Sequence, residues 1–89
     1  MGKFEYLPEP NNSDTIRFFA KSNKEDIGFI NFIFDSYEGI GNIRTLNENS
    51  GILEFRIAPD FLEEAEKLFE DFRKKISFHL ISEEEAGPY

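Results

Sequence analysis

Arginines at alternating positions of apolar segments are the residues of this sequence best suited to chemistry, because a planar guanidinium can bind a carboxylate or a phosphate through two hydrogen bonds. Arg17, Arg44 and Arg56 each lie in a short stretch in which apolar and polar residues alternate, as in a half-buried β-strand. Residues two apart on a strand point to the same side, so Phe19 and Lys21 should accompany Arg17. We therefore predict a recognition patch formed by Arg17, Phe19, Lys21, Arg44 and Arg56.

Residues that perform catalysis or bind metal ions are scarce and isolated. The sequence has no cysteine, and His79 is its single histidine, whereas a zinc site or an acid–base pair needs several such partners. The segment with Gly39 and Gly41 lacks the lysine and the third glycine of phosphate-binding loops, and it predicts a structural turn. We expect no catalytic residue, no metal site and no cofactor, and a small enzyme is the weakest alternative.

Hydrophobic spacing divides the middle of the chain into four strands and two helices. Alternating segments predict strands over residues 15–21, 43–46, 51–57 and 77–81. Apolar stripes with helical spacing predict helices near residues 23–38 and 60–76. Right-handed crossovers fold the order β-α-β-β-α-β into an α+β, two-layer, ferredoxin-like sandwich, with a four-stranded antiparallel sheet of spatial order 4-1-3-2 and both helices on one face.

Local signals mark where the helices should begin and end. Ser22 with Glu25, and Asp60 with Glu63, have the spacing of capping boxes, in which the side chains of the first and fourth residues each accept a backbone N–H of the other. Gly39 follows the first predicted helix, where a chain that leaves a helix often needs a left-handed residue. We predict a positive φ for Gly39, since glycine takes this conformation without a steric penalty.

Phenylalanine dominates the apolar composition, with 11 residues in a chain of 89. Phe18 and Phe55 fall on positions of the predicted strands that face the helices, and Phe69 and Phe72 fall on the apolar stripe of the second helix. Burying such a side chain contributes roughly 1.5–3 kcal/mol to folding. We predict that these four residues form the centre of a small core.

The two ends of the chain carry no regular hydrophobic pattern. The Pro- and Asn-rich residues 1–14 predict a loose N-terminal arm, and residues 82–89 predict a disordered acidic tail, which leaves a domain of residues 15–81. We see neither a signal peptide nor an apolar run that could span a membrane. Together with the absence of cysteine, this predicts a cytoplasmic location without membrane contact.

Charge is unevenly divided between the predicted faces. The formal net charge is −8, which disfavours nucleic acid as a partner. Four of the ten lysines and arginines nevertheless fall on the sheet face away from the helices, together with one acid, Glu54. We expect a non-catalytic binding or regulatory module that recognises an acidic protein or an anionic small ligand there, or that forms a homodimer. The alternative is a single-stranded RNA-binding domain that stacks bases on Phe19; a solvated face with ion pairs to Glu54 would have no such function.

Short motifs follow one another between Thr15 and Ile76: Tyr37-Glu38-Gly39-Ile40, then Arg44-Thr45-Leu46, the strand that starts at Gly51, and the helix start at Pro59-Asp60. In these motifs the chain resembles a small bacterial family known as domain of unknown function 4911. The resemblance implies a stand-alone, cytoplasmic bacterial domain with a ferredoxin-like fold. It brings no activity, substrate or catalytic residue.

Overall fold

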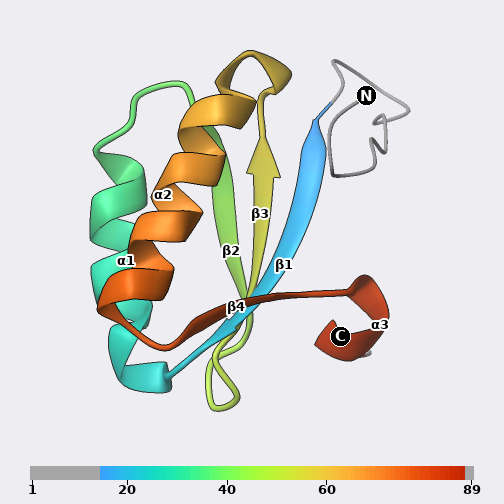
Figure 1. The fold of residues 1–89 in the computed structure, drawn as a ribbon. Helices are drawn as coiled ribbons and strands as arrows, with labels where there is room; N and C mark the ends of the chain where they lie inside the picture. The colour runs from blue at the N-terminus through green and yellow to red at the C-terminus, as the bar shows by residue number, and fades with distance from the viewer. Residues whose placement is uncertain (1–14, 88–89) are drawn as a thin grey trace.

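A single four-stranded sheet carries two helices on one of its faces (Figure 1). The computed structural model describes residues 15–87. The strands are β1 (Ile16–Ser22), β2 (Gly41–Asn47), β3 (Ile52–Ile57) and β4 (Phe78–Ile81), and the helices are α1 (Ile27–Asp35), α2 (Leu62–Lys75) and the single-turn α3 (Glu83–Ala86). Short 3₁₀ turns, η1 (Lys24–Asp26) and η2 (Pro59–Phe61), precede α1 and α2. No helix in this described part of the chain is long and apolar enough to cross a membrane.

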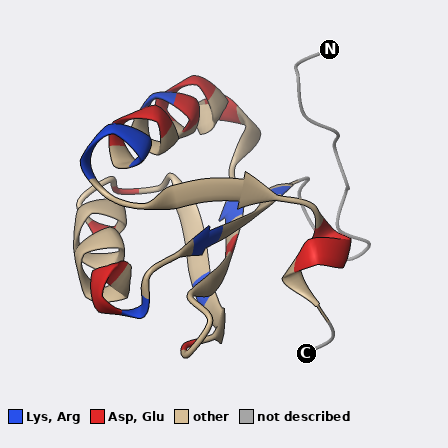
Figure 2. Cartoon of the chain, turned by 60° about the horizontal axis from the view of Figure 1, so that its bottom comes forward, with Lys and Arg blue, Asp and Glu red and all other residues tan. Residues whose placement is uncertain are grey.

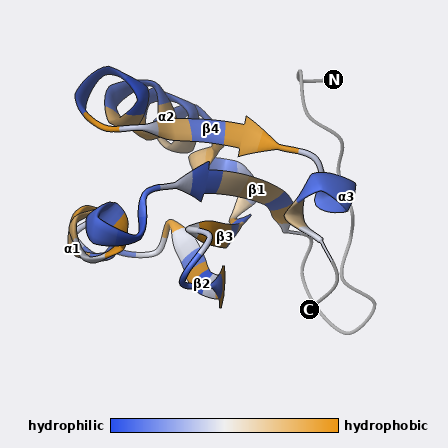
Figure 3. Cartoon of the chain, turned by 90° about the horizontal axis from the view of Figure 1, so that it is seen from below, coloured by the Kyte–Doolittle hydropathy of each residue, from blue (hydrophilic) through white to orange (hydrophobic). Residues whose placement is uncertain are grey.

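The topology confirms the predicted α+β, ferredoxin-like arrangement. The spatial order of the strands is β2-β3-β1-β4, and every neighbouring pair is antiparallel. In the view along the sheet in Figure 3, α1 and α2 lie on one side and α3 on the other. We call the side that carries α3 the outer face.

The core lies between the sheet and the two helices. Phe18, Phe55, Phe69 and Phe72 are all buried there, as predicted. The Phe55 ring lies 5.3 Å from that of Phe34 and 5.0 Å from that of Phe69, both in edge-on contact. Such pairs add a directional attraction to the burial of apolar area. Phe55 therefore joins α1, α2 and the sheet in one packed unit.

Neither predicted capping box forms. Ser22 is the last residue of β1 and is buried, and its hydroxyl donates to the carbonyl oxygen of Ser77 at 2.6 Å. The pairing of β1 with β4 has therefore extended the strand through the predicted cap. Asp60 lies inside η2, whose first residue is Pro59, and no side chain caps that turn. Proline suits a first helical position because it lacks the N–H that would need a cap.

The segment after β4 corrects the prediction of a disordered tail over residues 82–89. Residues 83–86 form α3, which begins with a complete capping box. The Ser82 hydroxyl accepts the Glu85 N–H at 3.1 Å, and the Glu85 carboxylate accepts the Ser82 N–H at 2.9 Å. Ala86 is buried against the outer face, which gives this short turn a tertiary contact. The predicted arm of residues 1–14 and the last residues, 88–89, lie outside the described part.

The turn between α1 and β2 confirms the positive φ of Gly39, which is 83°. The helix ends earlier than predicted, at Asp35. The Ser36 and Tyr37 N–H groups donate to carbonyls three residues back, those of Ile33 and Phe34, and such 3₁₀-type bonds tighten the last turn of a helix. Gly41 is the first residue of β2, and there a β-carbon would lie 2.9 Å from the Arg56 carbonyl carbon.

Replacing Gly39 with alanine should lower the free energy of unfolding by about 1 kcal/mol, because the left-handed conformation disfavours a side chain. The added methyl group would meet the Phe61 ring at 3.7 Å, an ordinary contact, so backbone strain alone sets the size of the effect. Urea unfolding of the two proteins measures it, and an unchanged midpoint would contradict it.

Candidate functional site

Side chains on the outer face are brought together by the strand register. Asn42 of β2, Arg56 of β3 and Arg17 of β1 form one row across the sheet, since each is the register partner of the next. The neighbouring row contains Arg44, Glu54 and Phe19 in the same strand order. The alternation of the strands thus gathers the three predicted arginines around one carboxylate.

Glu54 is the centre of this cluster. Its side chain is 2% exposed, although it is a carboxylate on the face away from the helices. Arg17 Nε donates to its Oε2 at 2.9 Å, and Arg56 Nε donates to the same oxygen at 3.4 Å. Oε1 lies 3.9 Å from Arg44 Nη1. Burial of a carboxylate is costly unless it is paired and hydrogen-bonded, so Glu54 and the arginines stabilise one another.

The three arginines differ in how far they remain accessible. The side chains of Arg17, Arg56 and Arg44 are 20%, 38% and 66% exposed. Arg17 also lies 3.5 Å from the Glu83 carboxylate of α3. Arg44 makes the longest of the three contacts to Glu54 and is the most accessible, so its guanidinium is the one best placed to meet a second anion.

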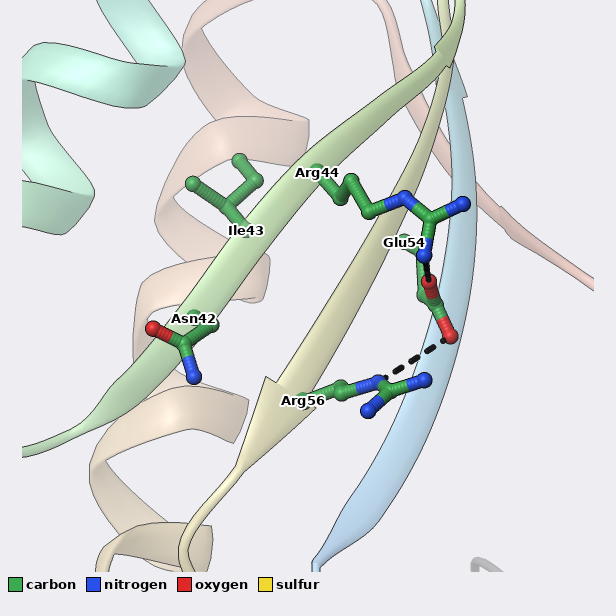
Figure 4. A pocket seen from close by; sticks show the side chains of 5 residues that line it. All are labelled: Asn42, Ile43, Arg44, Glu54 and Arg56. Atoms are coloured by element: carbon green, nitrogen blue, oxygen red, sulfur yellow. Dashed lines mark hydrogen bonds and ion pairs between the residues drawn. The ribbon is translucent and has the colours of Figure 1, made fainter.

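An open pocket of about 230 Å³ lies beside this cluster, over the paired strands β2 and β3 (Figure 4). Figure 4 shows Arg44 and Arg56 on either side of Glu54, with the Asn42 amide near the Arg56 end. We name this site the arginine pocket; its lining residues are Asn42, Ile43, Arg44, Glu54 and Arg56. Guanidinium groups donate hydrogen bonds, and an amide both donates and accepts them. The pocket therefore combines several donors with the Asn42 amide oxygen and with the Glu54 carboxylate, which is already paired.

Phe19 is buried, which corrects its predicted place in a solvent-facing patch. It is 5% exposed and packs with Ile52 and Ala86, with Leu46 and Ile81 partly buried beside them. The Arg17 guanidinium carbon lies 5.1 Å from the centre of the Phe19 ring, within the range of a cation–π contact. Phe19 thus helps to hold Arg17 and α3 on the outer face instead of presenting a ring to solvent.

Lys21 does not join the arginines, although it shares their face. Its register partners are Ile52 and His79, at the other end of the sheet. Lys21 and His79 are exposed there and do not line the arginine pocket. Of the five predicted patch residues, the structure therefore brings Arg17, Arg44 and Arg56 together and separates Phe19 and Lys21 from the pocket.

Two residues that contribute to the outer face, Asn42 and Ala86, were not predicted from the sequence, although the sequence contains a signal for each. Asn42 would have been found if the strand had been started at Gly41, because it then alternates with Arg44. Ala86 would have been found from Ser82 and Glu85, which have the capping-box spacing. Within residues 15–87 no group of three or more acidic, histidine or cysteine side chains is arranged to hold a metal ion.

Acidic and basic residues are unevenly distributed over the described surface. Figure 2 shows acidic residues along α2 and on α3, and basic residues on the strands and at the end of α2, where Arg73, Lys74 and Lys75 form the last turn. In the comparison with known protein families, residues 21–76 match the family model "Domain of unknown function (DUF4911)". No curated protein and no solved structure matches the chain.

Proposed function

Because the chain belongs to the family of domain of unknown function DUF4911, whose description names no activity, we propose a function from the geometry of its outer face. We propose that the protein is a non-catalytic recognition module that binds a carboxylate or phosphate group in the arginine pocket. The observation that carries this proposal is the convergence of Arg17, Arg44 and Arg56 on the buried Glu54. A reducing compartment such as the cytoplasm is the proposed location, in keeping with the cysteine-free sequence.

Glu54 supports this function by holding the pocket in shape. A guanidinium bound to a buried carboxylate loses rotamer freedom at folding, so less is lost when a ligand binds. Arg56 is positioned in this way, whereas Arg44 is 66% exposed and can turn its donors toward a ligand. A bidentate contact to Arg44, with Arg56 and Asn42 nearby, is the arrangement that a planar carboxylate or a phosphate fits.

The burial of Phe19 favours this proposal over the alternatives. Recognition of single-stranded RNA on such a sheet relies on aromatic rings that stack on bases, and α3 covers Phe19. Self-association through the outer face would need apolar area there, which Phe19, Leu46 and Ile81 are placed to supply. These residues already pack in a cluster with Ala86, which leaves less apolar area for a second copy.

Replacing Arg44 with glutamine should weaken the binding of citrate or inorganic phosphate about tenfold or more, because it removes a charge-assisted contact. The domain should remain folded, since Arg17 and Arg56 still pair with Glu54. NMR titration of the labelled full chain with each anion, at low and at high salt, measures the affinity. Added salt should weaken binding to the unmodified protein.

The matched control is Arg73→Gln, which makes the same chemical change on an exposed arginine of α2. It should bind both anions as the unmodified protein does. Equal affinities for Arg44→Gln and Arg73→Gln, or no binding of either anion to the unmodified protein, would overturn the proposed function. Replacing Arg44 and Arg56 together with glutamate is less informative, since it would put new carboxylates beside the buried Glu54.

A further inference from the structure

Strand β2 forms one border of the sheet and also one wall of the arginine pocket. It pairs with β3 on one side, and no other strand of the described chain pairs with it. β2 has seven residues, whereas β4, the strand at the other border, has four. The pairing of β2 with β3 is regular from Gly41 to Thr45, before a register shift between Thr45 and Asn47. An edge strand presents unpaired N–H and C=O groups on which an extended segment can add as a further strand.

The register identifies which backbone groups of β2 face outward. The Ala58 N–H donates to the Ile40 carbonyl at 2.9 Å, and in an antiparallel pair such bonded positions alternate with non-bonded ones. The register partners of Asn42 and Arg44 are Arg56 and Glu54, and counting in steps of two from Ile40 assigns both pairs to the bonded kind. Ile43 and Thr45 therefore direct their N–H and C=O groups away from β3, toward the open edge.

The side chains of β2 favour one sign of charge on a segment that pairs with this strand. Asn42 and Arg44 point to the outer face, and Arg44 is the one charged residue of β2. Acidic side chains on a segment beside β2 would lie next to Arg44 and the mouth of the pocket, and opposite charges on neighbouring strands attract. A second copy that paired through its own β2 would instead bring two Arg44 side chains onto one small face, which like-charge repulsion disfavours.

We propose that the partner of this protein is an acidic polypeptide segment that binds in extended form along β2, with a carboxylate in the arginine pocket. This inference rests on the proposed function, and it names the class of ligand and the way in which it binds. Backbone hydrogen bonds to Ile43 and Thr45 supply one part of the affinity, and Arg44 supplies the preference for acidic side chains.

The test uses the full chain and a blocked seven-residue peptide in which glutamate alternates with valine or threonine. Two control peptides have glutamine in place of glutamate, or N-methyl groups on the backbone of the valines. Binding is measured by calorimetry, and hydrogen exchange of the individual amides is followed by NMR. We expect the glutamate peptide to bind, to slow the exchange of the Ile43 and Thr45 amides, and to bind about tenfold more tightly than either control peptide, because each control lacks a hydrogen bond or a charge contact.

The matched protein variants are Thr45→Pro, which removes an outward N–H, and Thr45→Val, which keeps it. Proline is tolerated on an edge strand when its nitrogen faces solvent, and Thr45 is exposed. Thr45→Pro should reduce peptide affinity about tenfold, because one hydrogen bond to the peptide is lost. Thr45→Val should leave the affinity unchanged. If Thr45→Pro does not fold, the N-methylated peptide still tests strand addition on the unmodified protein.

The outcomes separate this inference from the proposed function. In one outcome, the glutamate peptide binds, its affinity depends on Arg44 but not on N-methylation, and hydrogen exchange of the Ile43 and Thr45 amides is unchanged. This outcome would overturn strand addition and leave anion recognition standing. Absence of binding by the peptide, citrate and phosphate alike would overturn both. Sedimentation could show that the unmodified chain is a dimer and that Thr45→Pro abolishes the dimer. The β2 edge would then pair with a second copy of the chain, and the inference would be overturned.

Discussion

Gly51→Ala should lower the free energy of unfolding by about 3 kcal/mol or more, since it combines backbone strain with a clash in a packed site. Gly51 is buried and has a φ of 71°. Its carbonyl accepts the Ser22 N–H at 2.8 Å, where the hairpin between β2 and β3 meets the end of β1. A β-carbon would overlap the Ser22 carbonyl oxygen and lie 2.7 Å from its carbon, and both belong to backbone that cannot turn aside.

Gly28→Ala is the control for this prediction. Gly28 lies in α1, and an added β-carbon there would meet nothing within 4 Å. Alanine in a helix interior is about 0.5–1 kcal/mol more favourable than glycine, so this variant should be slightly more stable. Urea unfolding followed by circular dichroism compares the two. Equal midpoints for Gly51→Ala and Gly28→Ala would show that the approach of Gly51 to Ser22 does not constrain the fold.

Phe55→Ala should cost about 3–5 kcal/mol of unfolding free energy, the range for a phenylalanine truncated in a core. Phe55 is 0% exposed, and its ring contacts those of Phe34, Phe69 and Phe78. These neighbours come from α1, α2 and β4, so collapse around the cavity would need three elements to move. A loss of this size is a large part of the stability of a small domain.

Phe32→Ala removes the same side chain from the surface of α1, where Phe32 is 74% exposed. The unfolding midpoint of Phe32→Ala should stay close to that of the unmodified protein, because the substitution removes little buried apolar area. Thermal unfolding of the two variants makes the comparison direct, since 1 kcal/mol shifts the midpoint of a domain of this size by about 4–8 °C. A small effect of Phe55→Ala would contradict the central place of its ring.

α3 connects the ion-pair cluster with the apolar part of the outer face. Glu83 approaches Arg17, and Ala86 packs on Phe19 and Ile52. α3 therefore covers the part of the outer face around Phe19 of β1, whereas the arginine pocket lies on β2 and β3. This division explains why the pocket and the edge of β2, instead of the whole face, form the candidate recognition surface.

Properties that depend on local spacing were determined by the sequence alone. Alternation of apolar residues gave the direction of Phe18 and Phe55 on their strands, and helical spacing gave the buried side of α2. Gly39 was recognisable because a conformation with positive φ is open to few residues besides glycine. The convergence of arginines on the side opposite the helices also followed, since strand period and strand order together place residues on a face.

Properties that depend on segments far apart in the chain were decided by the tertiary structure. Alternation gives the side to which Phe19 points, but its burial depends on Ala86, which arrives after β4. Ser22 has the sequence of a helix cap, yet pairing with β4 extends β1 as far as Ser22. The Ser22 hydroxyl then donates a hydrogen bond to the Ser77 carbonyl. Local sequence sets what each residue can do, and the partners that packing brings to it decide which option has the lower free energy. For that reason the sequence predicted the arginines, whereas the buried Glu54 that holds them and the outward amides of β2 came from the structure.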